Sequence, residues 1–342
     1  MLPATRAMRL VAGSEVLDRV RPSADKEMPA MWPNPRIPFA MSSERPPLPL
    51  LKGKPLIVNV VVNIEYWPFD RPTPRGVLPA PHGAKIDPPD VPNYAWVEYG
   101  MRCGMPRLFD MLEQRGIKAS AFMNAQVADV YPTLAQKVVE QDWELVGHGW
   151  FQRSLKQSED EAAEIRRCLD RLQALSGERV RGWFGAGGGE TYETPDLLKR
   201  AGVDFLHDWV VDDLPVWMAT ADGPLLCLPY TFELNDVPAW VVHSHGSDEL
   251  FKRLEATLAV VERELDRGPR IVTLGLHPHI VGVPHRAYHL ERALDLLAQR
   301  TDTVFVTSSQ IADWYVEADA DGPARLAEAV AAKGRQGPKA SS

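Results

Sequence analysis

The chain has 342 residues and a formal net charge of −8, from 46 acidic and 38 basic residues, and 45% of its residues are hydrophobic. This composition supplies the core of a globular protein and excludes disordered or collagen-like chains. Three widely spaced cysteines argue against a disulfide framework and favour a cytoplasmic location. The mixed charges argue against a nucleic-acid partner, and the lack of a long apolar run argues against a membrane-spanning segment.

The N-terminal segment is rich in proline, above all between residues 28 and 50. Proline at this density disfavours helices and central strands. We therefore expect residues 1–54 to form an extended, partly disordered arm, which lies on the body of the protein or on a neighbouring subunit. An acidic protein with such an arm predicts a homo-oligomer. At the other end, residues 318–342 are expected to form a C-terminal tail.

Between these ends, hydrophobic periodicity and turn residues predict alternating strands and helices. In chain order we expect a strand at 56–64, a long loop at 68–92, a helix at 105–115, a strand at 119–124, a helix at 131–141, a strand at 143–147, a helix at 158–176 and a strand at 180–184. There follow a helix at 194–201, strands at 205–207 and 225–228, a helix at 248–267, a strand at 271–276, a helix at 287–299, a strand at 304–307 and a helix at 308–317.

This alternation predicts one parallel α/β domain over residues 55–317. No glycine motif of the dinucleotide-binding or Walker type follows the first strand, which disfavours a nucleotide-binding open sheet. Chemically active residues come directly after several of the expected strands. A (β/α) barrel places its active site at that end of its strands, so the pattern favours a barrel.

Three of these strand ends carry the main candidate residues. Asn63 and Glu65 come at the end of strand 56–64 and face the same side, because residues two apart on a strand do so. His148 lies between two glycines after strand 143–147, and His277 follows strand 271–276. Buried polar groups are costly unless they are paired or used, so these residues predict a site. A structural hydrogen-bond network is the alternative for Asn63 and Glu65.

Two loops add further candidates. A glycine-rich loop follows Trp183 and ends at Glu190, and we expect its backbone to approach a ligand closely, with phosphate binding as a weaker alternative. Residues 209–217 place Asp213 among tryptophans, which suits a polar ring-shaped substrate, although a surface turn would have the same composition.

The motifs, taken together and in order, resemble the polysaccharide deacetylase (NodB-homology, carbohydrate esterase family 4-like) superfamily, and within it the branch of metal-independent allantoinases and cyclic imide hydrolases. They lie at residues 62–65, 98–104, 147–150, 181–184, 212–217, 228–236 and 275–277. The resemblance implies a distorted (β/α) barrel of the polysaccharide deacetylase type. It also implies a hydrolase that cleaves a non-peptide C–N amide bond in a cyclic ureide, an imide or an N-acyl compound.

The sequence departs from the metal-using members of this superfamily. In those members an Asp-x-Asp and a His-x-x-x-His motif supply the base and three metal ligands. Here Asn63, Glu65 and Gln152 replace three of these four residues, and only His148 matches. Two protein ligands are too few for a tight catalytic zinc site, so we expect no cofactor and no metal ligands.

The resemblance and the residues together assign the candidate roles. Glu65 is expected to be the base, with a raised pKa, while His148 and His277 orient water, stabilise the oxyanion or protonate the leaving nitrogen. The expected substrate-binding residues, around a small amide or sugar, are Asn63, Arg102, Trp183, Glu190 and Asp213.

Two other functions stay open. The first is a metal-dependent de-N-acetylase of (poly)saccharides, in which a divalent metal such as zinc recruits His279 or His245. The histidine pairs 243/245 and 277/279 come late in the chain, which disfavours a dinuclear metal centre of the amidohydrolase type. The second is a catalytically silent barrel that binds a small molecule.

Overall fold

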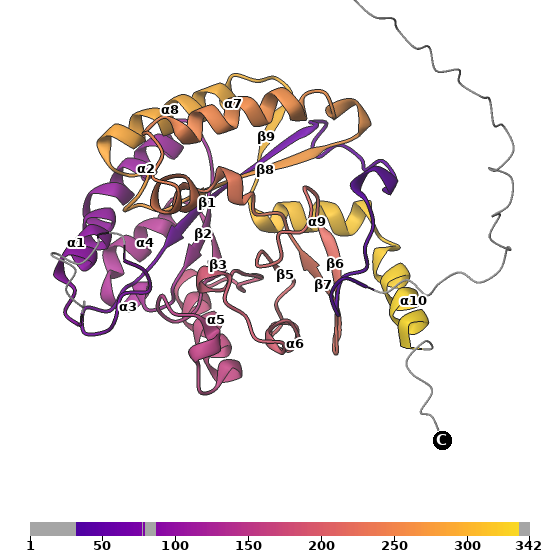
Figure 1. The fold of residues 1–342 in the computed structure, drawn as a ribbon, viewed down its shortest axis with the longest axis horizontal. Coiled ribbons are helices and arrows are strands. Elements are labelled where there is room, and N and C mark those ends of the chain that lie inside the picture. Colours follow the sequence, from indigo (N-terminus) through magenta and orange to yellow (C-terminus); the bar gives the residue numbers. More distant parts are fainter. Residues whose placement is uncertain (1–31, 77, 79–86, 335–342) are drawn as a thin grey trace, which may run out of the picture.

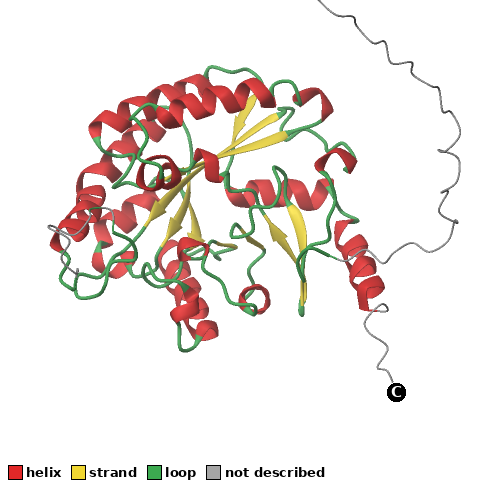
Figure 2. Ribbon diagram, in the orientation of Figure 1, coloured by secondary structure: helices red, strands yellow, loops and turns green. Residues whose placement is uncertain are grey.

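Strand β1 (Leu56–Ile64) runs through the middle of the molecule, and all nine of its residues are buried. We describe the protein from a computed structural model, which covers residues 32–76, 78 and 87–334. The bounds of β1 agree with the strand expected at 56–64. An unbroken run rich in valine and isoleucine suits a strand that is covered on both faces. The other strands are arranged around it, with helices outside them (Figure 1, Figure 2).

The strands form one curled sheet in the order β6-β7-β5-β4-β3-β2-β1-β8, and β9 also pairs with β1. Every pair is parallel except the hairpin of β6 and β7. A bridge between Asn235 and Gly275 joins the segment after β7 to the far edge of the sheet. The predicted barrel-like α/β fold is therefore confirmed. The remaining strands are β2 (Ser120–Met123), β3 (Glu144–Gly147), β4 (Gly182–Trp183), β5 (Phe205–Leu206), β6 (Val216–Thr220), β7 (Gly223–Cys227), β8 (Arg270–Leu276) and β9 (Thr303–Phe305).

Helices cover the outside of the curled sheet (Figure 2). Most begin and end where local signals predict: α5 begins after Asp160, whose side chain accepts a hydrogen bond from the Ala163 amide, and ends at Gly177 with φ 77°. The helices are α1 (Val91–Tyr99), α2 (Met105–Glu113), α3 (Val127–Val130), α4 (Pro132–Glu140), α5 (Glu161–Ser176), α6 (Thr194–Arg200), α7 (Glu249–Val261), α8 (Pro284–Ala298), α9 (Ser308–Ala318) and α10 (Gly322–Gly334). None of those in the described residues is long and apolar enough to cross a membrane.

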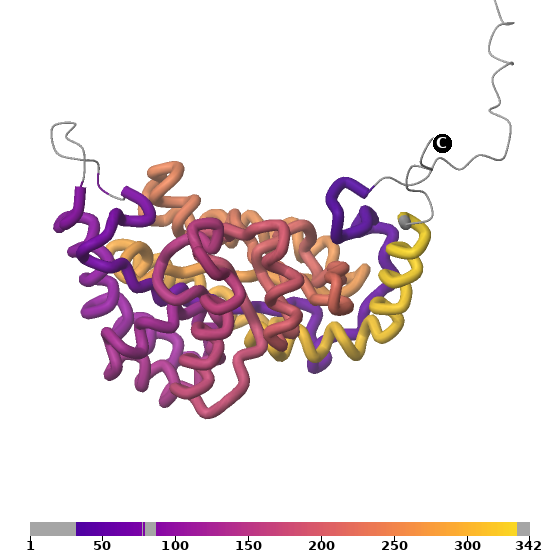
Figure 3. The backbone as a smooth tube through the Cα atoms, turned by 90° about the horizontal axis from the view of Figure 1, so that it is seen from below, coloured from indigo at the N-terminus to yellow at the C-terminus, as the bar shows by residue number. Residues whose placement is uncertain are grey.

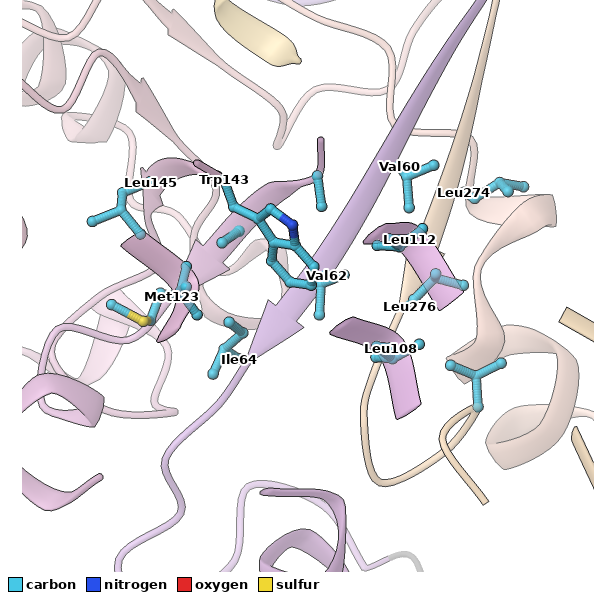
Figure 4. Packing of buried hydrophobic residues seen from close by; sticks show 14 of the residues in the cluster. Val60, Val62, Ile64, Leu108, Leu112, Met123, Trp143, Leu145, Leu274 and Leu276 are labelled. Carbon is cyan, nitrogen blue, oxygen red and sulfur yellow. The ribbon is translucent and has the colours of Figure 1, made fainter. Parts of the chain in front are cut away.

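The alternation of side chains along β1 separates two apolar layers. Val60, Val62 and Ile64 point outward and pack with residues of α2 and β8 (Figure 4). Ile57 and Val61 point into the barrel, where aromatic residues from other strands surround them. Because alternate residues share a face, the interior face continues to the candidate site residues at the end of β1.

The described part of the N-terminal arm lies against its own chain, beside α10 and the hairpin of β6 and β7 (Figure 1, Figure 3). The Ala219 amide of edge strand β6 donates to the Arg36 carbonyl oxygen at 2.9 Å, and Arg36 pairs with Asp196 at 2.7 Å. Further along, the indole of Trp314 donates to the carbonyl oxygen of Pro49 at 3.0 Å. The arm thus covers an exposed sheet edge. Residues 1–31 lie outside the described residues, and the homo-oligomer stays a prediction.

Four of the named helices and strands were not predicted, and the shortest of them is α3 (Val127–Val130). Helix α1 begins at Val91, inside the expected loop 68–92, and its regular pattern is obscured by polar and aromatic residues. Strand β6 begins at the end of segment 209–217, which suggested either a substrate-binding loop or a surface turn. The C-terminal tail expected at 318–342 contains α10, which packs against β6 and buries Leu326. Residues 335–342 of that tail lie outside the described residues.

Candidate active site

A cavity of about 140 Å³ opens at the C-terminal end of the parallel strands. It includes Glu65 after β1, His148 after β3 and His277 after β8, so the strand-end positions do meet as the barrel pattern predicts. Its full lining is Glu65, Arg75, His148, Gln152, Phe184, Gly187, Tyr230, Phe232, Asn235, Val237, Pro238 and His277.

His277 lies between two carboxylates. Its Nδ1 is 2.6 Å from Oδ1 of Asp236, and its Nε2 is 3.3 Å from Oε1 of Glu65. The backbone amide of His277 also donates to Oδ2 of Asp236 at 2.6 Å. All three residues are nearly inaccessible, with 0% exposure for Asp236, 4% for Glu65 and 6% for His277. Water therefore screens these charges little, and each depends on its neighbours.

This arrangement fixes the charges at neutral pH. Burial opposes the charged form of His277, but Asp236 and Glu65 outweigh burial and raise the pKa of His277 to about 9. Burial likewise opposes ionisation of Glu65, yet the charge of His277 holds the pKa of Glu65 well below its usual value. The expected raised pKa of Glu65 is therefore wrong, because its neighbour is an imidazolium rather than an apolar wall.

His148 presents a free nitrogen to the same carboxylate. Its Nδ1 is 2.6 Å from the carbonyl oxygen of Phe184, which can only accept, so Nδ1 carries the proton. In the neutral ring Nε2 then keeps its lone pair, and this atom is buried without a hydrogen-bond partner, 3.8 Å from Oε1 of Glu65. Gly149, with φ 80°, turns the chain sharply after the histidine.

Gln152 acts as a hydrogen-bond donor at this site. Its Nε2 donates to Oε1 of Glu65 at 2.8 Å, while the indole of Trp67 donates to Oε2 at 2.9 Å. Each carboxylate oxygen of Glu65 thus accepts one hydrogen bond and has a second lone pair for a further donor. Within residues 32–76, 78 and 87–334, no three histidine, cysteine, aspartate or glutamate side chains are arranged to hold a metal ion.

Tyr230, which lines the cavity, is held by two amide side chains. The hydroxyl of Tyr230 accepts a hydrogen bond from Nδ2 of Asn63 and another from Nδ2 of Asn235, each at 2.9 Å. Asn63 is fully buried and also donates to the carbonyl oxygen of Leu276 at 3.2 Å. Asn63 therefore supports Tyr230 and does not line the cavity itself.

Trp183 does not reach the cavity, although it was expected to bind substrate. It is fully buried on the outer face of the sheet, where its ring packs against Gly147 and Leu169. The next residue, Phe184, lines the cavity and stacks on His148 with ring centroids 5.4 Å apart. The expectation was wrong by one residue, which on a strand reverses the direction of the side chain.

Three other expected binding residues also lie outside the cavity lining. Arg102 pairs with Glu98 at 2.5 Å, and 75% of its side chain is exposed. Glu190 accepts a hydrogen bond from the Trp209 indole at 2.7 Å, and burial raises the pKa of Glu190 to about 7. Burial also raises the pKa of Asp213, which lies beside another acid. None of the three residues lines the cavity.

The two extra histidines weighed as metal ligands lie apart from each other. His279 packs edge-on against Trp67 with ring centroids 5.6 Å apart, and burial lowers the pKa of His279 to about 3. His245 pairs with Glu249 at 2.8 Å and is 40% exposed. Neither histidine lines the cavity.

Sequence reasoning missed three residues of this cavity region: Arg75, Tyr230 and Asp236. Tyr230 and Asp236 belong to the segment 228–236, which carried part of the family resemblance, so that segment was the available signal. Arg75 lies in the long loop after β1, where nothing in the sequence distinguishes it from the loop's other polar residues.

Comparisons with known proteins agree with this architecture. Residues 89–206 match the family model for polysaccharide deacetylase. A curated relative from Schizosaccharomyces pombe, named "Putative polysaccharide deacetylase", is 25% identical over 236 residues, which span 63% of this chain and 73% of the relative.

Two crystal structures share the fold. The "probable Polysaccharide deacetylase" from Pseudomonas aeruginosa PAO1 has a TM-score of 0.71 at 24% identity, covering 80% of this chain and 95% of that chain. PuuE allantoinase has a TM-score of 0.72 at 23% identity, covering 84% of this chain and 98% of that chain. These likenesses confirm the barrel fold predicted from the motifs.

The charge on His277 can be tested through Asp236. In Asp236→Asn the nearest negative charge is lost, so we expect His277 to lose its proton about 1–3 pH units lower than in the wild type. The measurement is an NMR titration of the imidazole. Asp248→Asn, which removes a surface carboxylate paired with Lys252, serves as control and should leave the titration unchanged. An unshifted titration in Asp236→Asn would contradict the assignment.

Proposed function

The chain carries a polysaccharide deacetylase domain, and from this premise we propose that it hydrolyses a non-peptide C–N amide bond of a small molecule without a tightly bound metal. One observation carries the proposal: the buried imidazolium of His277, held between two carboxylates, faces the same small cavity as the free Nε2 of His148. Amide hydrolysis needs an activated water, a stabilised oxyanion and a proton for the leaving nitrogen, and this cavity offers a group for each.

In this proposal Glu65 and His148 bind and activate the water. Their facing atoms, Oε1 and Nε2, are both acceptors and lie 3.8 Å apart, so one water can donate a hydrogen bond to each of them. A water held in this way turns its lone pairs toward the substrate. As the water attacks the carbonyl carbon, one of these two acceptors takes its proton. Ionised Glu65 also stabilises a positive charge that forms on His148.

His277 is the proton donor in this mechanism. Asp236 accepts from Nδ1, so the proton on Nε2 is the one available to the leaving nitrogen. Because the pKa of His277 is raised to about 9, the ring is protonated at neutral pH before the substrate binds. Asp236 acts through His277 and is a positioning residue.

Tyr230 supplies a donor for the oxyanion. A phenolic hydroxyl has two lone pairs and one hydrogen, and the amides of Asn63 and Asn235 occupy both lone pairs. Its hydrogen is therefore left to donate, and burial raises the pKa of Tyr230, which keeps the hydroxyl protonated. A fixed donor in a buried site stabilises developing negative charge strongly.

The side chains present fit a zinc ion poorly. A hydrolytic zinc keeps three protein ligands and one water. Here the amide of Gln152 donates to Oε1 of Glu65, the oxygen nearest both histidines, and Nε2 of His277 holds a proton instead of a lone pair. We therefore propose a mechanism in which no step runs through a metal.

Removal of the Glu65 carboxylate tests the proposal. The wild type should hydrolyse at least one member of a panel of cyclic ureides, cyclic imides and N-acyl compounds. Glu65→Gln keeps the shape but loses the negative charge, so we expect kcat/KM to fall on the order of 10²-fold or more.

The matched control is Glu249→Gln, which removes a carboxylate paired with Arg253 on α7 and should keep full activity. Equal rates for Glu65→Gln and the wild type would refute the proposed role of Glu65. If the wild type turned over no member of the panel, the silent binding barrel would be the better account.

The oxyanion role of Tyr230 predicts a separate effect. Tyr230→Phe removes one oxygen and keeps the ring, so we expect kcat to fall about 10²- to 10³-fold, the usual loss for one oxyanion donor, while KM changes little. Steady-state kinetics with any reactive panel member measures both constants. Tyr288→Phe, at a position 60% exposed on α8, is the control. A loss confined to KM would show that the hydroxyl only binds the substrate.

A further inference from the structure

Arg75 is a cavity residue that the proposed chemistry does not use. It lies on the loop after β1, is half-buried, and lines the cavity together with Glu65, His148 and His277. Its guanidinium lies close enough to Tyr230 and His279 for its charge to act on both: it opposes the rise that burial causes in the pKa of Tyr230 and adds to the fall that burial causes in the pKa of His279. Among the residues that the structure describes, Arg75 has no hydrogen-bond acceptor and no ion-pair partner.

Neither acid of the site, Glu65 or Asp236, forms an ion pair with Arg75, and each is held by other donors. Both oxygens of Glu65 accept hydrogen bonds from Gln152 and Trp67. Both oxygens of Asp236 are bonded to His277, one to the ring and one to the backbone amide. The five N–H donors of Arg75 are therefore left for whatever enters the cavity.

The chemistry of a guanidinium indicates which kind of ligand enters the cavity. Its planar fork matches the two oxygens of a carboxylate, and such charge-assisted pairs are about twice as strong as neutral hydrogen bonds. The cavity holds about 140 Å³, which suits a small molecule. Phe184, stacked on His148, and Phe232, 47% exposed, give it an aromatic wall.

We infer that Arg75 binds a carboxylate of the substrate, so that the substrates are small amides with a carboxylate near the bond that is cleaved. This inference rests on the proposed amide hydrolysis and narrows its substrate class. Arg75 holds the carboxylate while the amide carbonyl lies over the water site between Glu65 and His148, and Arg75 itself takes no part in proton transfer.

Calorimetric binding of two matched probes tests the inference through affinity, independently of the reaction rate. The probes are N-acetylglycine, an amide with a carboxylate, and N-acetylglycine methyl amide, its neutral analogue. We expect the wild type to bind the acid about 10- to 100-fold more tightly than the neutral probe, as a charged hydrogen-bond partner provides. In Arg75→Gln this preference should disappear.

Arg71→Gln is the matched control, because Arg71 lies on the same loop but stacks on Phe151 at 4.8 Å and does not line the cavity. It should keep the preference, and thermal unfolding should show that both variants fold. Equal binding of the probes by the wild type, binding of neither probe, or a preference that survives in Arg75→Gln would overturn the inference.

Failure of the proposed function gives a different result. If Arg75 governs binding of the acid but no amide is hydrolysed, carboxylate binding by Arg75 is supported and the proposed hydrolase activity is refuted. If amides are hydrolysed and a carboxylate on the substrate improves neither binding nor rate, the hydrolase activity is supported and the role of Arg75 is refuted.

Discussion

The buried imidazolium of His277 between Asp236 and Glu65 is the interaction on which the site depends. Each of these charges would be costly in a dry interior by itself, and loss of one partner from a buried pair typically costs about 3–5 kcal/mol. Together they alternate in sign, and hydrogen bonds occupy the oxygens of both carboxylates. The site can therefore be buried and charged before a substrate binds, which limits reorganisation during the reaction.

The barrel supplies this arrangement from three distant segments. Strands β1 and β8 run in parallel with Val62 opposite Leu276, so Glu65 and His277 leave the sheet side by side. The segment after β7 then reaches β8 through the bridge at Gly275, which brings Asp236 under the ring. Position 275 leaves no room for a side chain, because a Cβ there would come within 2.7 Å of the Tyr230 hydroxyl. The closure of the sheet and the position of the Tyr230 hydroxyl thus depend on the same contact.

The sequence was most informative where local pattern decides structure. The bounds of β1 and the positions of Glu65, His148 and His277 after their strands followed from periodicity and from the barrel pattern. Trp183 was misplaced because β4 has only two residues, too few to reveal which face is buried. Arg102 and Glu190 were misplaced because they pair with Glu98 and Trp209, and such pairings leave no periodic signal.

Other features could not be read from the sequence because they depend on long-range contacts. The direction of the Glu65 pKa shift depends on His277, more than 200 residues away along the chain. The proposed role of Tyr230 follows only when the two amides that donate to its hydroxyl are counted. Arg75 becomes noticeable only once the acids around it are seen to be occupied. In each case the property of the residue depends on which hydrogen bonds and ion pairs form in the folded protein.

The most direct test of the account is the rate of amide hydrolysis before and after chelation, with the metal content of the same protein sample measured alongside. The account places the acid, the base and the oxyanion donor on side chains of this chain. It therefore predicts well under one metal ion per chain and an unchanged rate after chelation. Loss of turnover on chelation, with recovery on addition of zinc, would contradict it.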